Sequence, residues 1–184
     1  MTVHARRLLF MLPVVTIIVL VDRLTKWWAT ETLMHRATRH YLGDSLRIGY
    51  TENTGVFLGL GDSLPPAVRF TLFVVVVGLT LAFVAWYLVT AAHLGRRRVL
   101  CLTFILAGGI GNLIDRIAYH GVVVDFLNIG IGGLRTGVFN VADMAVTAGV
   151  IALALTGSLG PPKPRTKAEP PEPTAEGTED SLLR

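Results

Sequence analysis

The sequence predicts an all-α membrane protein, a four-transmembrane-helix bundle with a small extracytoplasmic β-rich segment between the first and second helices. Two observations predict this class. Of the 184 residues, 52% are hydrophobic and only 16% are charged, whereas a soluble domain carries about 25% charge. The apolar residues also gather into four segments of about 20 residues, the length that crosses a ~30 Å hydrocarbon core.

The predicted spans are residues 8–28, 68–89, 99–118 and 138–159. Helices are expected because backbone groups in lipid must be hydrogen-bonded within the span. Arg6 and Arg7 precede the first span as in a secretory signal, but no small-x-small cleavage site follows it. Charged residues and the interfacial pair Trp27-Trp28 follow instead, so we expect this span to be retained.

The placement of lysine and arginine predicts the orientation. With the N-terminus inside, these residues divide about evenly between the two sides. Arg96, Arg97 and Arg98, however, occupy the shortest connection, and short loops weigh most in the positive-inside rule. Both termini are therefore expected in the cytoplasm.

Three longer segments lie outside the predicted spans. Residues 30–66 are punctuated by glycines and predict short strands and turns, arranged as a small sheet lying on the membrane. Residues 119–137 combine an apolar stretch that suits the interface with glycines that allow a turn. Residues 160–184 are rich in proline and charge and cannot bury enough apolar area to fold. We expect a disordered cytoplasmic tail there, following a membrane domain of residues 1–159.

The polar residues in and near the predicted spans, which are energetically costly to place in a membrane, all lie toward its predicted outer face. Ionisable and amide groups in or near spans tend to be functional, and helices built for stability alone have no reason to present them together. Asp143 is the most informative, because an unpaired carboxylate in its apolar surroundings costs several kcal/mol. The group consists of Asp22, Lys26, Asn53, Asn112, Asp115, Arg116, Asp125, Asn140 and Asp143.

Simpler structural explanations remain open for several of these residues. Asp22 and Lys26, four residues apart, suit an ion pair on a helix surface. Asp115 and Arg116 suit a charge pair at the membrane interface. Asn140 suits the cap of the fourth helix.

Nucleophilic and metal chemistry fit the sequence poorly. Cys101 lies in an apolar stretch with no histidine at matching depth, which favours a packing role. Ser63 is followed closely by Pro65-Pro66, which predicts a turn. The five histidines are scattered and lack the spacing of zinc proteases, so no metal site is predicted.

Paired carboxylates remain as the expected chemistry. Two carboxylates held close together share one proton, so one can activate water while the other polarises a carbonyl. This would hydrolyse a peptide without a nucleophile or a metal. Sequence spacing alone leaves both Asp115 and Asp125 open as the partner of Asp143.

Five short motifs follow one another along the chain: DRLTK at 22–26, NTG at 53–55, GGIGNLIDR at 108–116, GVVVDF at 121–126 and FNVAD at 139–143. Together they resemble the lipoprotein signal peptidase family, also called signal peptidase II. The motifs occur in the family's order and with its four-helix topology. Only the tail after about residue 160 falls outside the resemblance.

The resemblance implies an aspartic endopeptidase with Asp125 and Asp143 as the catalytic pair, and no cofactor. Phe57-Leu58 departs from the family, which often has a small residue followed by Phe there, so the shape of this outer segment stays open. Supporting or substrate-binding roles are implied for Asp22, Lys26, Asn53, Gly55, Gly108, Asn112, Asp115, Arg116 and Asn140.

The resemblance also implies the partners and the location. The substrate class is the prolipoprotein carrying diacylglycerol on its lipobox cysteine, cut just before that cysteine. A monomer is expected in the bacterial inner membrane, in contact with lipid, with its active site near the outer face. The close small-residue spacing of residues 108–111 would let helix backbones approach there.

Two other function classes would also use part of this pattern. A proton-coupled transporter component would also use intramembrane carboxylates, but the inner halves of the spans are almost purely apolar, which argues against a proton path. A non-enzymatic membrane scaffold would need only the glycine-rich faces. Nucleic acid is not an expected partner, because no basic patch is interleaved with aromatic residues.

Overall fold

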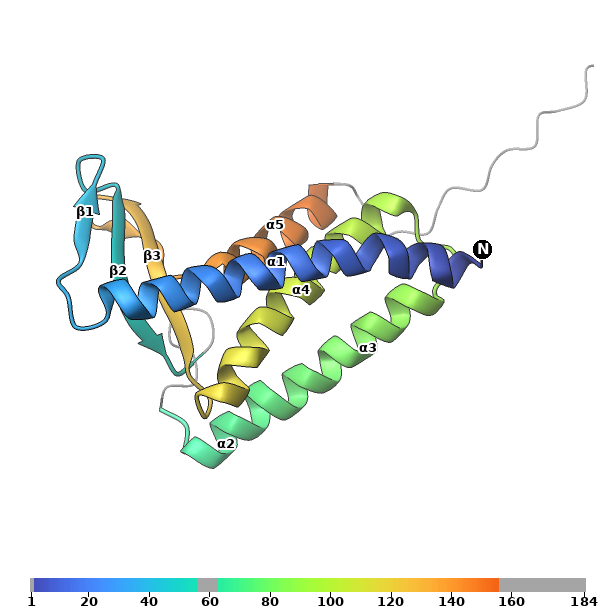
Figure 1. The fold of residues 1–184 in the computed structure, drawn as a ribbon, viewed down its shortest axis with the longest axis horizontal. Coiled ribbons are helices and arrows are strands. Elements are labelled where there is room, and N and C mark those ends of the chain that lie inside the picture. Colours follow the sequence, from blue (N-terminus) through green and yellow to red (C-terminus); the bar gives the residue numbers. More distant parts are fainter. Residues whose placement is uncertain (1, 56–62, 156–184) are drawn as a thin grey trace, which may run out of the picture.

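The computed structural model describes residues 2–55 and 63–155 and shows a mostly helical protein with a small antiparallel sheet at one end (Figure 1). Predictions for Phe57-Leu58 and for the tail at 160–184 fall outside the described residues. The helices are α1 (Val3–Leu33), α2 (Pro66–Phe70), the π-helix η1 (Thr71–Val76), α3 (Val77–Thr90), α4 (Arg96–Ala118) and α5 (Val141–Leu155). The strands are β1 (Arg39–Tyr41), β2 (Leu46–Asn53), β3 (Val123–Ile131) and β4 (Leu134–Arg135).

Three helices in the described part of the chain are long and apolar enough to cross a membrane: Val3–Leu33, Ala67–Thr90 and Arg96–Ala118. They contain the first three predicted spans and extend beyond them. The extension is largest for α1, whose 31 residues reach about 46 Å at 1.5 Å per residue. Its last turns therefore pass beyond a ~30 Å core and carry the sheet.

The fourth predicted span begins later than expected. Residues 138–140 precede α5, which starts at Val141, and residues 156–159 lie outside the described chain. The described helix is apolar but has 15 residues. The prediction placed the helix start too early because Val138 and Phe139 continue the apolar pattern, whereas Asn140 provides the cap that sets the boundary.

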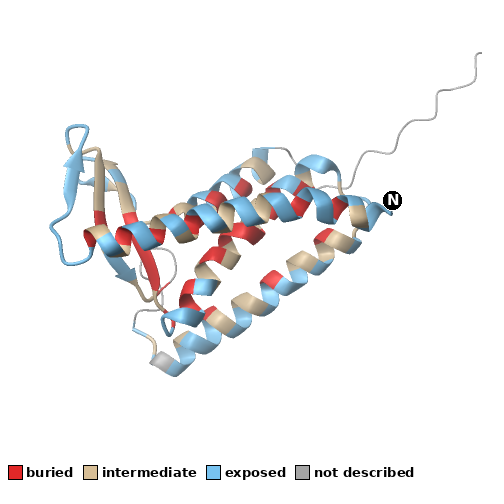
Figure 2. Ribbon diagram, viewed as in Figure 1, coloured by how far each residue is buried: buried red, intermediate tan, exposed pale blue. Residues whose placement is uncertain are grey.

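Helix α4 holds the bundle together and is more buried than α1 or α3 (Figure 2). It packs closely on α5 because glycines remove side chains from the contact. A Cβ on Gly149 would lie 2.7 Å from the carbonyl oxygen of Cys101, and a Cβ on Gly108 would overlap the carbonyl of Ala142. Cys101 itself is buried, in agreement with its expected packing role.

The sheet draws strands from both connections, not from the first alone. β1 pairs antiparallel with β2, as the segment at 30–66 predicted. β2 then pairs antiparallel with β3, from Leu46↔Ile129 to Asn53↔Val123, with an irregularity between Ile48 and Thr51. The second connection, predicted as an interfacial stretch and a turn, therefore supplies a central strand. Its apolar run was ambiguous because a short buried strand shows no alternation.

The sheet is anchored to the last turns of α1. Phe126 of β3 packs with Ala29 and Leu33, both fully or almost fully buried, and its ring meets Trp28 edge-on at 6.4 Å. This contact fixes β3 beside α1.

The opposite end of α1 is fastened to the turn between α3 and α4. Arg7 donates from Nη1 to the carbonyls of Leu88 (3.0 Å) and Ala91 (2.5 Å), and from Nη2 to those of Ala92 (3.0 Å) and Leu94 (3.1 Å). The Leu88 carbonyl lies in the last turn of α3, where helical partners are missing, and the other three carbonyls lie in the turn that follows. The N-terminus and the α3–α4 turn thus lie at one end, and the sheet lies at the other (Figure 1).

Candidate active site

Asn140 and Asp143 open α5 as a reciprocal cap. The backbone N–H of Asp143 donates to Asn140 Oδ1 (2.9 Å), and the backbone N–H of Asn140 donates to Asp143 Oδ2 (3.1 Å). This is the capping-box arrangement with Asn and Asp in place of Ser and Glu. It fixes the Asp143 carboxylate in the first turn of the helix, where the positive end of the helix dipole favours negative charge.

Asp125 reaches the same place from the sheet. Its Oδ1 accepts from Asn140 Nδ2 (2.6 Å), and its Oδ2 accepts from Asn53 Nδ2 (2.9 Å). The residue is 1% exposed. Burial raises the pKa of Asp125 to about 6, and the charge of Asp143 adds to the rise, whereas the two amide donors oppose it. Asn140 therefore joins both carboxylates, one through its side chain and the other through its backbone.

Asn112 on α4 links Asp143 to a lysine. Its Nδ2 donates to Asp143 Oδ1 (2.7 Å), and its Oδ1 accepts from Lys26 Nζ (2.9 Å) and Asn140 Nδ2 (3.0 Å). Because an ammonium can only donate and a carboxylate accepts, the two neighbours determine which way this amide points.

Lys26 is buried between acidic groups of two helices. Its Nζ lies 2.9 Å from Oδ2 of Asp22 and 2.9 Å from Oδ2 of Asp115. With Asn112 these are three acceptors for the three N–H bonds of the ammonium. Asp22 also accepts from the backbone N–H of Ala142 at 2.9 Å. The cluster therefore locks α1, α4 and the start of α5 together.

Arg23 completes the cluster and was not among the predicted site residues. It donates to Asp115, to Oδ2 of Asp22 at 3.0 Å and to the carbonyl of Gly111 at 3.3 Å. Two cations thus balance two carboxylates. Arg23 stands inside the first sequence motif, but at the end of a predicted span an arginine reads equally well as a topology signal, so sequence patterning did not separate the two roles.

Arg116 and Gly55 are joined at another side of the site. Arg116 Nη2 donates to the carbonyl of Gly55 (2.9 Å), and the backbone N–H of Gly55 donates to Asn53 Oδ1 (3.0 Å). The guanidinium carbon lies 5.6 Å from the ring centroid of Phe73. Its buried Nε has no hydrogen-bond partner within residues 2–55 and 63–155.

All predicted site residues except Gly108 belong to this one connected network. Gly108 lies instead at the α4–α5 contact, where an added Cβ would be 2.8 Å from Val146 Cγ2. The positions of the side chains also decide between the simpler structural explanations given for these charged residues. Asp22 and Lys26 do pair, but in the interior and not on a helix surface. Asp115 faces Lys26 and Arg23 in place of an interfacial pairing with Arg116.

The arrangement brings the buried carboxylate of Asp125 and the half-buried carboxylate of Asp143 to one asparagine, beside a neutralised charge cluster. Asp115 is saturated by cations and by the N–H of Val124 at 3.3 Å, whereas Asp125 and Asp143 accept from neutral amides. Such a pair can share a proton and activate water. Among the described residues, no group of three or more His, Cys, Asp or Glu side chains is arranged to hold a metal ion.

Comparisons with known proteins identify the family of this chain. The family model described as signal peptidase (SPase) II matches residues 14–158. A lipoprotein signal peptidase of Sphingopyxis alaskensis is 36% identical over 73% of this chain and 76% of its own, and one of Solibacter usitatus is 34% identical over 77% and 86%.

A solved bacterial membrane enzyme, determined by the in meso method at 2.3 Å resolution, superposes with a TM-score of 0.73 at 25% identity. The superposition covers 87% of this chain and 94% of that structure. Together with the apolar helices, this identifies a multi-pass bacterial membrane protein, and the chain belongs to the signal peptidase (SPase) II family.

Proposed function

We propose that this protein is an aspartic endopeptidase that removes the signal peptide from diacylglyceryl-modified prolipoproteins, with Asp125 and Asp143 as its catalytic pair. Removal of signal peptides from prolipoproteins follows from the family. The aspartic mechanism and the residue roles rest on the site. The observation that carries the proposal is that Asn140 hydrogen-bonds both carboxylates, at 2.6 Å to Asp125 and 3.1 Å to Asp143.

The mechanism uses one proton between two carboxyl groups. The raised pKa of Asp125, about 6, favours Asp125 as the protonated group that polarises the scissile carbonyl. The ionised Asp143 takes a proton from water, which attacks the carbonyl carbon. The tetrahedral intermediate then collapses, the C–N bond breaks, and the departing amine of the cysteine receives a proton from the pair.

The surrounding residues have supporting roles. Asn53, Asn112 and Asn140 orient the pair, and the cluster of Asp22, Lys26 and Asp115 braces the helices that carry it. Arg116 has a buried Nε without a partner in the described chain, which suits a backbone carbonyl of the substrate. Gly55, held by Arg116 and Asn53, shapes the entry.

The same geometry supports a proposed arrangement in the membrane. We assign residues 1–159 to one peptidase domain with α5 as the fourth span, and both termini to the cytoplasm. The site would then lie near the outer face of the bacterial inner membrane, because it shares the sheet's end of the bundle. A precursor anchored by its diacylglyceryl chains presents its scissile bond at this depth. A monomer suffices, since every proposed catalytic group comes from one chain.

The proposal is tested by incubating the purified protein in lipid with a lipobox precursor, with and without its diacylglyceryl group, and measuring cleavage. We expect cleavage of the lipidated precursor alone, reduced by about 10²–10⁴-fold in Asp125→Asn and Asp143→Asn. Glu31→Gln, an exposed carboxylate on α1, is the control for loss of one charge. Undiminished cleavage by either aspartate variant would rule out the assigned pair. The comparisons do not support the transporter alternative.

A further inference from the structure

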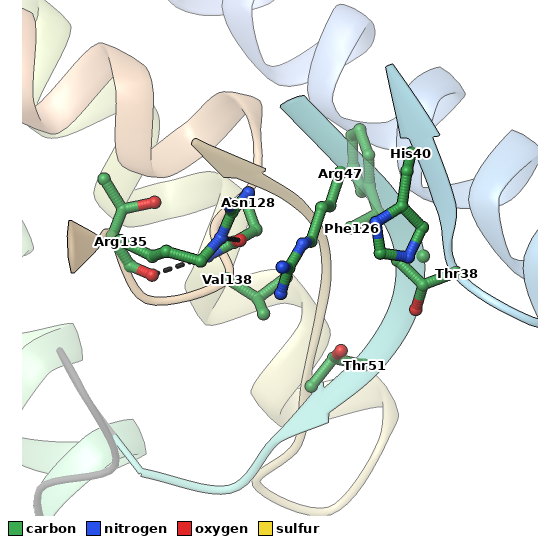
Figure 3. Close-up of a pocket in the computed structure, with 10 residues that line it drawn as sticks. Thr38, His40, Arg47, Thr51, Phe126, Asn128, Arg135 and Val138 are labelled. Atoms are coloured by element: carbon green, nitrogen blue, oxygen red, sulfur yellow. Dashed lines mark hydrogen bonds between the residues drawn. The ribbon is translucent and has the colours of Figure 1, made fainter. Parts of the chain in front are cut away.

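A cavity of about 460 Å³ lies on the sheet outside the carboxylate network (Figure 3). It is lined by residues of all four strands and of the segments beside β1 and β4, and its polar lining includes His40, Arg47, Asn128 and Arg135. Two arginines that are permanently charged therefore face one cavity. None of these residues takes part in the proposed catalytic pair.

The cavity borders the two strands that carry Asn53 and Asp125 of the candidate active site. Thr51 lines it and is paired in register with Asp125 on β3, and Phe126, the next residue, lines it as well. Arg47 lies on the same strand, four residues before Thr51. At ~3.3 Å per residue this separation is about 13 Å, the length of roughly four residues of extended chain.

The arginines keep an excess of positive charge. Asp44 accepts from Arg47 Nε (2.7 Å) and Nη2 (2.6 Å), and its backbone carbonyl accepts from Arg135 Nη1 (2.8 Å). One carboxylate thus faces two guanidinium groups, with His40 also 2.6 Å from it. Arg135 Nε donates a hydrogen bond to Asn128 Oδ1 at 2.6 Å, but the buried Nη2 of Arg135 has no partner among the described residues.

We propose that this cavity is a subsite for the polar segment that follows the scissile bond, and that Arg47 and Arg135 favour an acidic side chain about four residues after the cut. The inference rests on the proposed function. The apolar signal segment must stay among the helices, so the polar chain beyond the cysteine is the part that can cross the sheet. A carboxylate there would add a second negative charge beside two guanidinium groups that share only Asp44.

The test is a position scan. Lipidated precursors with a neutral segment after the cysteine receive a single Asp, or Asn as its match, at each successive position. We expect wild-type kcat/KM to favour Asp over Asn about fivefold, with a maximum about four residues after the cut. The ratio should fall to about one in Arg47→Gln and Arg135→Gln. It should persist in Arg39→Gln, an exposed β1 arginine that does not line the cavity.

Reversing the charge of one arginine should create the opposite substrate preference. Arg135→Glu should favour a precursor with Lys at that position over one with Asp. Because each result is a ratio within one enzyme, partial loss of folded protein does not alter it. If an arginine variant fails to fold, the wild-type scan alone decides.

Other outcomes overturn the subsite. The subsite is ruled out if the wild-type protein shows no preference for Asp over Asn at any position. It is also ruled out if the preference is unchanged in both arginine variants. Rates that follow the phosphatidylglycerol content of the vesicles, and not the precursor's side chain, would assign the cavity to a lipid headgroup instead. Cleavage of no precursor at all would be a failure of the proposed function, a different result from equal cleavage of every precursor.

Discussion

Asn140 and Asp143 each accept the other's backbone N–H, at 2.9 Å and 3.1 Å, while Asn140 Nδ2 also donates to Asp125 at 2.6 Å. One residue therefore both starts α5 and sets the relative position of the two carboxylates. The cap uses the amide oxygen of Asn140, and the bond to Asp125 uses its nitrogen. Substitutions can separate these two roles.

Asn140→Ser keeps an oxygen that can cap the helix but removes the donor to Asp125, and Asn140→Ala removes both. We expect both variants to lose about 10²-fold in kcat/KM, because the pair is no longer held in register. Asn140→Ala should in addition be less stable than Asn140→Ser by about 1 kcal/mol, the value of a cap. Cleavage assays and denaturant unfolding in detergent measure the two effects. Wild-type activity in Asn140→Ser would show that Asp125 does not need this donor.

Most of the site could be predicted from sequence, because polar side chains in apolar helices are costly and therefore conspicuous. The partner of Asp143 could not be derived from spacing. Asp115 lies in the last turn of α4 and Asp125 only ten residues later in β3, and the difference arises from tertiary contacts. Asp115 turns to Lys26 on α1, whereas Asp125 is brought to Asn53 by a strand pairing between distant segments. The family resemblance supplied what local patterning could not.

The sheet shows the same limit. β2 was expected because glycines punctuate its segment, but β3 was not, since Val122 to Leu127 is apolar apart from Asp125 and lacks the alternation of a half-exposed strand. Its strand identity comes from burial between β2 and the last turns of α1. Arg23 was missed for a related reason, because a charge near a span end has an ordinary topological explanation.

Lys26 offers a test of the buried charge cluster. Lys26→Met leaves Asp22 and Asp115, both 0% exposed, with Arg23 as their remaining cation. Breaking a buried pair in this way costs about 3–5 kcal/mol, so we expect a large loss of unfolding free energy in detergent. Adding Asp115→Asn should restore part of it, with a coupling of about 1–3 kcal/mol in a double-mutant cycle. Strict additivity would mean that Lys26 and Asp115 do not interact energetically.

Asp125 predicts a pH dependence of stability. Its pKa rises from 3.8 to about 6 on folding, so the folded protein binds this proton more tightly than the unfolded chain does. The protonation of Asp125 therefore contributes to the unfolding free energy, by as much as about 3 kcal/mol. This contribution is fully present below about pH 4 and is lost as the pH rises through about 6. In Asp125→Asn the unfolding free energy should depend less on pH between about pH 4 and 6.

Asp44→Asn is the contrasting control for that titration. Hydrogen bonds from Arg47 and His40 hold the pKa of Asp44 well below its usual range. Its contribution is therefore present above the ordinary carboxyl pKa and is lost as the pH falls further. The Asp44 variant should keep the decline between pH 4 and 6. An identical decline in Asp125→Asn would contradict a raised pKa at Asp125.

Gly108 tests whether close packing of α4 on α5 positions the site. In Gly108→Ala the new Cβ would be 2.8 Å from Val146 Cγ2 and 3.1 Å from the backbone nitrogen of Val146, and it would overlap the carbonyl of Ala142. Backbone cannot yield as a flexible side chain does, so α5 must shift, at a cost of about 1–3 kcal/mol.

The shift should also reduce activity. The N–H of Ala142 bonds to Asp22, and Asp143 follows it directly, so a displaced α5 moves a carboxylate of the pair. Gly133→Ala adds the same methyl group where nothing lies within 4 Å and should leave both unfolding midpoint and cleavage rate unchanged. Cleavage rate and thermal midpoint, measured together, decide the matter. Equal behaviour of the two alanine variants would show that the helix contact at Gly108 can widen without moving Asp143.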